Sequence, residues 1–288
     1  MVISSGKKVC TDVEWYEKPT FPAAAAVAVT LNLNLNHSCF VISCFLIANM
    51  FLKQRASAGR EGLRTTLLLK KYYPLFFSGK KVLMFSRKNR MPDGYTIREM
   101  ADDQVLAMRN LEIDRACVLG VSQGGMISQY IAIDHPEVVE KLVLAVTAPN
   151  ANDVVQDAVG SWIRMAEEGD HVSLMVDTAE KMYSGPYLEK HRRLFPVMAR
   201  FTKPKDYDRF LKNARAILFF DARYELTKIK APSLIIAGDD DHTVGNDAPY
   251  ILKEGISGSE LFTYHGLGHG VFEEAKDFYS RVFDFCEK

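Results

Sequence analysis

Short apolar runs recur along the chain from residue 80 onward, and each has the length of a buried strand. They are rich in Val, Ile, Leu and Phe and occupy residues 82–85, 116–121, 141–146, 233–237 and 260–264. Segments with helical spacing lie between several of these runs. Continuous apolar strands that alternate with helices are typical of a parallel sheet buried on both faces. The pattern therefore predicts the α/β class, with a mostly parallel sheet and helices on both of its faces.

Three segments are predicted to form helices. Residues 97–111 follow a capping box formed by Thr96 and Glu99, whose hydroxyl and carboxylate accept hydrogen bonds from backbone N–H groups at the helix start. Residues 123–134 are the second such segment. In residues 271–286 the apolar positions recur every three or four residues, which predicts one continuous helix.

Residues 151–225 interrupt the alternation of strands and helices. This segment has helical patterns, several Met and Tyr residues, and no strong strand pattern. We therefore expect a core built from residues 80–150 and 226–288, with 151–225 inserted as a helical cap. Residues 1–79 would complete the core as its N-terminal part, although only 26–36 alternates clearly like a strand.

The pattern becomes regular abruptly near residue 80. We hypothesise that residues 15–75 derive from a misread or shifted coding sequence. Sequencing the encoding DNA tests this hypothesis, because an uninterrupted frame in a folded, active protein would refute it.

Composition and charge fit an ordinary globular protein. The 288 residues are 48% apolar and 25% charged, with 36 Lys and Arg against 36 Asp and Glu. Such a chain can bury a sizeable core, and the composition excludes collagen-like, disordered and coiled-coil classes. A net charge of zero without a Lys/Arg block argues against a nucleic-acid partner, because nucleic acids bind basic surfaces.

One apolar run raises the question of a membrane. Residues 39–52 (CFVISCFLIANMFL) include Asn49 and fall short of the about 20 residues that a spanning helix needs. We therefore expect a buried core segment and no membrane partner. A membrane-tethered form is the alternative, and solubility of the purified protein without detergent would argue against it.

The five cysteines give no framework for a metal or a disulfide. They are scattered at Cys10, Cys39, Cys44, Cys117 and Cys286. Their number is odd and their spacing matches no zinc site. We expect reduced thiols, a cytoplasmic location and no bound metal.

Ser122 is the first candidate for chemistry. It lies at the centre of residues 120–124 (GVSQG), between a predicted strand and a predicted helix. A strand that turns straight into a helix strains its central residue and points the side chain off the sheet, and glycines two positions away relieve the crowding. The backbone N–H of Gln123 can then donate to an oxyanion. The motif therefore predicts a nucleophilic serine.

A nucleophilic serine needs a base and an orienting carboxylate. The run GDDD follows one predicted strand, and we expect Asp241 to be the acid, with Asp240 as the alternative. The run GLGHG follows the next strand, and we expect His269 to be the base, with His265 or His242 as alternatives. Both runs lie at carboxyl ends of strands, where open α/β sheets place their sites.

At these residues the sequence resembles the α/β-hydrolase superfamily, in its esterase-like branch with a helical cap. The likeness covers roughly residues 80–150 and 221–288. It is carried by GYTIREMADD (94–103), LGVSQGGMISQYIAIDHPEVVEKLVL (119–144), IKAPSLIIAGDDDHTV (229–244) and HGLGHGVFEEAKDF (265–278). The resemblance implies the α/β-hydrolase fold and no cofactor. It also implies Ser122 as nucleophile, Asp241 as acid and His269 as base.

Two features depart from the family pattern. Family members carry His-Gly on a strand near the elbow, and the following loop supplies a second oxyanion donor; the nearest substitute here is His37 with Ser38. Residues 82–85 are followed by Ser86, where the family has Asp and a Gly-rich turn. Loss of one oxyanion donor typically costs about 10²–10³ in rate. The alternative is therefore a catalytically weak or inactive protein of the same fold that binds a small ligand or a partner protein.

Taken together, the sequence predicts a serine hydrolase that acts on an ester, or a related acyl or carbon–carbon bond, of a small-molecule substrate. Haloalkane dehalogenases and epoxide hydrolases of this fold carry Asp at the elbow, so Ser122 argues against both. Within the predicted cap, Trp162, Met182 and Tyr183 are expected to line an apolar substrate pocket.

Overall fold

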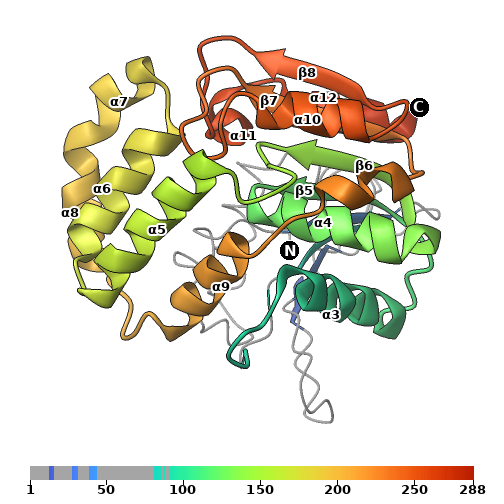
Figure 1. Ribbon diagram of the computed structural model, residues 1–288, viewed down its shortest axis with the longest axis horizontal. Helices are drawn as coiled ribbons and strands as arrows, with labels where there is room; N and C mark the ends of the chain where they lie inside the picture. Colours follow the sequence, from blue (N-terminus) through green and yellow to red (C-terminus); the bar gives the residue numbers. More distant parts are fainter. Residues whose placement is uncertain (1–12, 16–27, 32–38, 44–80, 86, 88–90) are drawn as a thin grey trace, which may run out of the picture.

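Eight strands in the described part of the chain form one sheet (Figure 1). The computed structural model describes residues 13–15, 28–31, 39–43, 81–85, 87 and 91–288. In chain order the strands are β1 (Val13–Trp15), β2 (Ala28–Leu31), β3 (Cys39–Ser43), β4 (Lys81–Phe85), β5 (Ala116–Val121), β6 (Val139–Ala145), β7 (Ser233–Gly238) and β8 (Glu260–Tyr264). In space the order is β1-β2-β4-β3-β5-β6-β7-β8. The β1–β2 and β2–β4 pairs are antiparallel and the remaining pairs are parallel, so the predicted mostly parallel sheet is confirmed.

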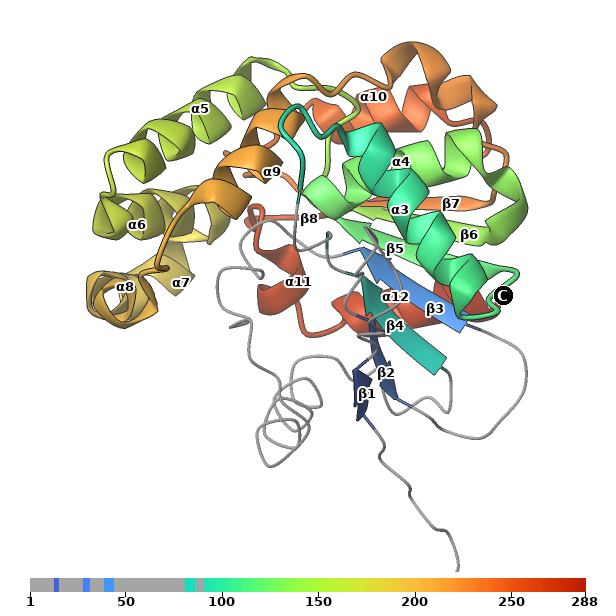
Figure 2. The same ribbon diagram turned by 90° about the horizontal axis from the view of Figure 1, so that it is seen from below.

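Helices cover both faces of this sheet, as Figure 2 shows. One face carries α3 (Ile97–Asn110), α4 (Gln123–Asp134) and α10 (Ala248–Gly255), and the other carries α12 (Phe278–Glu287). Successive strand residues point to opposite faces. On β5, Val118 therefore packs in the cluster of α4, whereas Leu119 packs in the cluster of α12. The predicted two-sided cover is confirmed.

The elements with strong local signals agree with the sequence. β5, α4 and β8 have the predicted limits. At the start of α3 both hydrogen bonds of the capping box are present: Glu99 N donates to Thr96 Oγ1 (3.2 Å) and Thr96 N donates to Glu99 Oε2 (2.8 Å).

The last predicted helix is wrong as a single element. Residues 271–286 form two helices, α11 (Val271–Glu274) and α12, and Ala275 between them is extended (φ −80°, ψ 116°). Asp277, just before α12, accepts a hydrogen bond from the Tyr264 hydroxyl on β8 (3.0 Å). The apolar spacing continues across the break because both helices pack on the same cluster. The spacing of apolar residues alone therefore does not reveal where α11 ends and α12 begins.

A layer of helices is inserted between β6 and β7 and lies beside the sheet (Figures 1 and 2). It consists of α5 (Asp153–Glu167), α6 (His171–Met182), α7 (Gly185–His191), α8 (Phe195–Thr202) and α9 (Asp208–Leu218). Its two ends meet at a bridge between Asn150 and Asp221, where Ala151 N donates to Phe220 O (2.9 Å). We call residues 151–221 the helical insertion. The division of the chain into a core and a cap domain stays a prediction.

The N-terminal strands fall within two of the segments singled out in the sequence. β2 lies in the alternating segment 26–36, and β3 comprises the first residues of the apolar run 39–52. β3 is central, between β4 and β5, so this part of the run belongs to the sheet. The rest of both segments, and most of residues 15–75, lie outside the described residues. None of the described helices has the length and apolar character that crossing a membrane requires.

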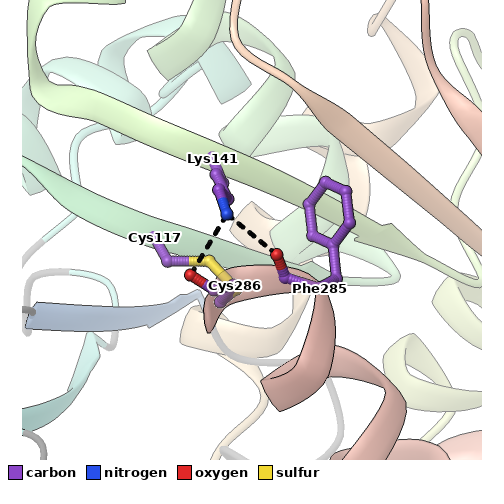
Figure 3. Close-up of a disulfide and its surroundings, with 4 residues drawn as sticks. All are labelled: Cys117, Lys141, Phe285 and Cys286. Carbon is purple, nitrogen blue, oxygen red and sulfur yellow. Dashed lines mark hydrogen bonds between the residues drawn. A yellow bond between two sulfur atoms is a disulfide. The ribbon is translucent and has the colours of Figure 1, made fainter. Parts of the chain in front are cut away.

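A disulfide joins Cys117 on β5 to Cys286 on α12 (Figure 3). Beside it, Lys141 Nζ on β6 donates to the carbonyl oxygens of Phe285 (3.0 Å) and Cys286 (3.3 Å). The expectation of reduced thiols is therefore wrong for this pair. The two cysteines are 169 residues apart, so no spacing signal relates them. Packing of the last helix on the sheet brings them together.

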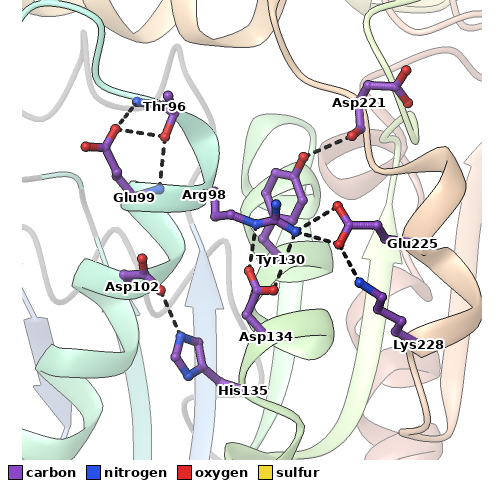
Figure 4. A network of polar contacts seen from close by, with 10 residues as sticks. All are labelled: Thr96, Arg98, Glu99, Asp102, Tyr130, Asp134, His135, Asp221, Glu225 and Lys228. Carbon is purple, nitrogen blue, oxygen red and sulfur yellow. Dashed lines mark hydrogen bonds and ion pairs between the residues drawn. The ribbon is translucent and has the colours of Figure 1, made fainter.

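A polar network fastens α3 to α4 and to the segment that leaves the helical insertion (Figure 4). Arg98 on α3 pairs with Asp134 on α4 (2.8 Å) and with Glu225 on a 3₁₀ turn (2.8 Å). Its guanidinium carbon lies 4.1 Å from the ring centroid of Tyr130, whose hydroxyl donates to Asp221 O (3.0 Å). The hydrogen bond from Lys228 and then that from Arg98 hold the pKa of the Glu225 carboxyl below its usual value.

Candidate active site

Ser122 occupies a strained turn between β5 and α4. Its backbone has φ 55° and ψ −122°, a conformation that non-glycine residues rarely adopt. A Cβ on Gly120 would lie 2.5 Å from Ser128 Oγ and 2.6 Å from Gly124 O, so only glycine fits there. Thr147 Oγ1 donates to Ser122 O (2.8 Å) and supports the turn. The turn has the geometry expected of the GVSQG motif.

His269 lies against the serine. Its Nε2 is 2.9 Å from Ser122 Oγ and its Nδ1 is 2.8 Å from Asp241 Oδ2. A carboxylate only accepts hydrogen bonds, so Nδ1 carries the proton and Nε2 is left to accept from the serine hydroxyl. All three side chains are buried. The structure thus joins the three residues predicted as nucleophile, base and acid in one chain of hydrogen bonds.

Asp241 is oriented by its own loop. Its Oδ1 accepts hydrogen bonds from Thr243 N (2.8 Å) and Val244 N (3.0 Å), which leaves Oδ2 for the imidazole. Two backbone donors on one oxygen fix the direction of the carboxylate. This loop follows β7, and the loop of His269 follows β8, as the sequence predicts.

The alternative acid Asp240 and the alternative bases His242 and His265 form ion pairs separate from the hydrogen-bonded chain of Ser122, His269 and Asp241. Asp240 lies 3.1 Å from His242, and Asp239 lies 2.8 Å from His265. The imidazoles of both pairs are exposed, with side-chain exposures of 64% for His242 and 90% for His265. The geometry therefore favours Asp241 and His269 among the candidates.

Gln123 can offer its backbone but not its side chain to an oxyanion. It is the first residue of α4, where helix N–H groups have no acceptor within the helix. Its side chain is engaged on both sides, accepting from Arg87 and donating to Asn213 O on α9 (2.9 Å). β5 lies between β6 and β3, and β3 ends at Ser43. His37 and Ser38, the nearest substitute for the His-Gly motif, lie outside the described residues.

The C-terminal end of α6 is hydrogen-bonded to both loops that carry the triad partners. From the loop that carries Asp241, which we call the acid loop, Thr243 Oγ1 donates to Lys181 O (3.3 Å). From the loop that carries His269, which we call the base loop, Gly270 N donates to Met182 O (2.7 Å). The last carbonyls of a helix need donor partners outside the helix, and here the two loops supply them. The position of α6 and the position of the imidazole are therefore linked.

The residues after this helix end extend the contact to α11. Tyr183 Oη donates to Glu273 Oε2 (2.6 Å), and both N and Oγ of Ser184 donate to the Glu274 carboxylate. We call Tyr183, Ser184, Glu273 and Glu274 the α6–α11 clamp. Desolvation, reinforced by the neighbouring Glu273 carboxylate, raises the pKa of the Tyr183 phenol, which keeps it a donor. Sequence reasoning missed this clamp, although the consecutive glutamates soon after His269 were a signal that could have found it.

The three residues predicted to line the substrate pocket differ in their surroundings. Met182 and Tyr183 lie at the clamp, and the Tyr183 ring stacks on Tyr187 (centroids 4.3 Å apart). Trp162 is buried inside the helical insertion, where its indole N–H donates to Asp177 (2.8 Å). The structure thus places Met182 and Tyr183 beside the base loop and Trp162 elsewhere. No group of three His, Cys, Asp or Glu side chains that could hold a metal occurs in the part of the chain that is described.

Comparisons with known proteins identify the family of this chain. The family model described as alpha/beta hydrolase fold matches residues 84–276. The AB hydrolase superfamily protein YisY of Bacillus subtilis is 27% identical over 70% of this chain and 77% of its own length. A putative carbamate hydrolase RutD of Serratia proteamaculans is 23% identical over 68% of this chain and 74% of its own.

Solved structures share the fold. The alpha/beta hydrolase enzyme MGS-M2, from a Medee basin deep-sea metagenome library, superposes with a TM-score of 0.77 at 18% identity, covering 93% of this chain and 97% of that one. The enol-lactonase from Burkholderia xenovorans has a TM-score of 0.73 at 20% identity, covering 94% and 100%. Because the family model spans most of the chain and the sheet has the same architecture, the protein belongs to the α/β-hydrolase superfamily and is an enzyme of that family.

Proposed function

We propose that the protein is a serine hydrolase that cleaves an ester, or a related acyl or carbon–carbon bond, of a small molecule through an acyl-enzyme. The observation that supports this most is the hydrogen-bonded chain from Ser122 through His269 to Asp241 at a strained elbow. A serine hydroxyl is a weak nucleophile unless an oriented base removes its proton. Here the base is within hydrogen-bond reach and its tautomer is set by a carboxylate.

The proposed reaction uses each of these groups in turn. His269 Nε2 takes the proton of Ser122 as the oxygen attacks the substrate carbonyl, and the oxyanion accepts a hydrogen bond from Gln123 N. The imidazolium then gives its proton to the leaving group, and an acyl-enzyme remains. The same nitrogen activates water, which releases the acid and restores the hydroxyl. Throughout, Asp241 holds the imidazole tautomer and stabilises its positive charge.

The named relatives are consistent with acyl chemistry on small molecules. They include a putative carbamate hydrolase and an enol-lactonase, whose substrates both carry a carbonyl carbon open to attack. For the pocket of this chain we propose Met182 and Tyr183 as substrate contacts, because they lie next to the loop of His269. The contacts of Trp162 give its predicted role no support.

Turnover of an ester panel tests the proposal. We expect the native protein to hydrolyse short p-nitrophenyl esters, and Ser122→Ala to lose at least about 10³ in rate. His265→Gln is the matched control, because it removes an exposed imidazole outside the triad. A hydrolysis rate that survives in Ser122→Ala would contradict the proposal.

A second candidate is a catalytically weak protein of the same fold whose main role is to bind a small ligand. It is favoured by one observation, the lack of the family's His-Gly before Ser122. A well-folded native protein that turns over none of the esters, yet is stabilised against heat by one of them, would select this candidate.

A further inference from the structure

α8 lies at the outer edge of the helical insertion (Figures 1 and 2). Together with the short 3₁₀ helix Arg192–Leu194 that precedes it, α8 carries a row of exposed apolar side chains. Leu194, Val197, Met198 and Phe201 are 52%, 52%, 44% and 82% exposed. Their spacing of three and four residues places them on one face of the helix. The opposite face holds Ala199, which is fully buried. Clustered apolar side chains on a surface indicate a site of interaction, and we call these four residues the α8 apolar row.

The same segment carries a local excess of positive charge. Residues 190–205 contain six Lys and Arg and no Asp or Glu, although the chain as a whole is neutral. The neutral total conceals this excess, which our charge argument from composition missed. Arg193, in the 3₁₀ helix Arg192–Leu194 that leads into α8, and Arg200, on α8 itself, are both exposed and adjoin residues of the row in sequence. Arg192 is already paired with Glu180 (2.6 Å).

We propose that the face formed by the α8 apolar row with Arg193 and Arg200 docks the enzyme reversibly on an anionic lipid surface. Interfacial helices combine an apolar face that enters the acyl boundary with Lys and Arg that meet lipid phosphates. A nucleic acid would use the cations but would leave the apolar row in water. A lipid surface satisfies both features. The proposal departs from the expectation of no membrane partner, which was argued from the apolar run 39–52 alone, and it places the protein on the membrane surface rather than across it.

Docking at this face would bring the lipid close to the helices that contact the triad loops. Phe195, the first residue of α8, stacks on Tyr183 of the α6–α11 clamp (centroids 5.9 Å apart). The proposal rests on the surface of the helical insertion alone and does not depend on the chemistry of Ser122. The Ser122→Ala variant should therefore bind lipid as the native protein does.

Co-sedimentation of the full chain with vesicles tests the proposal. We expect phosphatidylcholine vesicles containing phosphatidylglycerol to bind it at least about tenfold more tightly than phosphatidylcholine alone, and high salt to reduce that difference. The double variant Arg193→Gln/Arg200→Gln should lose about 25-fold in partition, at about fivefold per arginine. Phe201→Ser should lose about tenfold through the apolar area that no longer enters the lipid.

Two residues of the same types, exposed outside the proposed docking face, provide matched controls. Phe219 is 87% exposed at the end of α9, and Arg109 is exposed on α3. Phe219→Ser and Arg109→Gln should bind like the native protein, and equal thermal midpoints would show that all variants are folded. Equal binding to neutral and anionic vesicles, or equal losses in Phe201→Ser and Phe219→Ser, would overturn the proposal. The proposal would also be overturned if the native protein bound no vesicles and instead formed a dimer that Phe201→Ser dissociates. The α8 apolar row would then contact a second copy of the chain.

Discussion

Ser122, His269 and Asp241 come from three loops that are far apart in sequence and adjacent at one edge of the sheet. Each had a local signal: a serine between glycines, a histidine between glycines, and an acidic run, all after apolar strands. Residue type and position after a strand were therefore enough to name the candidates. The sequence favoured Asp241 and kept Asp240 as the alternative. The geometry supports Asp241, because its carboxylate contacts His269 and accepts from the backbone of residues 243 and 244.

The two neighbouring carboxylates give the first prediction. Asp241→Asn should lower the turnover rate by about 10³–10⁴, because the amide no longer fixes the imidazole tautomer. Asp240→Asn should change the rate less than about threefold, since its partner His242 lies outside the triad. Steady-state rates of the two variants on one ester provide the comparison. Equal losses in both would contradict the assignment of Asp241.

Met182 and Tyr183 were named from the sequence for their apolar and aromatic character. Their contacts support a place near the site for a different reason. The Met182 carbonyl accepts a hydrogen bond from the loop of His269, and the Tyr183 hydroxyl donates one to α11. The same criterion selected Trp162, whose indole is used inside the helical insertion. Side-chain type therefore does not separate a residue that packs from one that lies near the site.

Secondary-structure elements with complete local signals were predictable to the residue. The capping box marked the start of α3, and Gly120 with Gly124 marked the junction of β5 and α4. The break between α11 and α12 was missed because the apolar spacing runs through it, whereas the nearby contact between Tyr264 and Asp277 joins two different elements. Tertiary contacts of this kind leave no periodic trace in the sequence.

The α6–α11 clamp gives a prediction about how elements position the base. Glu274→Gln weakens the acceptor of both Ser184 hydrogen bonds and should slow modification of Ser122 by a phosphonate about tenfold or more, because small displacements of a catalytic group are costly. Ser184→Ala removes only the hydroxyl donor and should have a smaller effect. Glu254→Gln is the control, because the Glu254 side chain is exposed on α10, and it should react at the native rate. A native rate in Glu274→Gln with an unchanged unfolding midpoint would show that the clamp does not position His269.

The Arg98 network gives a prediction about stability. Arg98→Met should lower the free energy of unfolding by about 1–2 kcal/mol, since it removes two ion pairs and the contact with the Tyr130 ring. Arg109→Met breaks one pair in which both side chains are 58% exposed, and should cost less than about 0.5 kcal/mol. Urea unfolding measures both values. Similar losses in the two variants would mean that the network adds nothing beyond an exposed pair.

Viewed as one chain, the fold class and the sheet direction followed from the alternation of apolar strands and helices. The disulfide did not, because a covalent link across 169 residues depends on how the last helix packs under β5. Nor did the positive face of α8, because a total charge of zero averages it away. Quantities summed over a sequence conceal features that depend on where residues meet in space.

The disulfide gives a prediction for the protein as a whole. Reduction of Cys117–Cys286, or Cys286→Ser, should lower the free energy of unfolding by about 2–4 kcal/mol, because the link restricts a long loop of the unfolded chain. Peptide mapping without reductant should recover the two cysteines in one linked species. Recovery of both as free thiols from folded protein would contradict the link.

The most direct measurement is the intact mass of the protein after reaction with a fluorophosphonate, which reacts with an activated serine. The account predicts one adduct per native chain and none in Ser122→Ala, because the Ser122 hydroxyl is hydrogen-bonded to the base that would activate it. His265→Gln should label as the native chain does. No adduct on well-folded native protein, or an adduct that persists in Ser122→Ala, would contradict the assignment of Ser122 as the nucleophile.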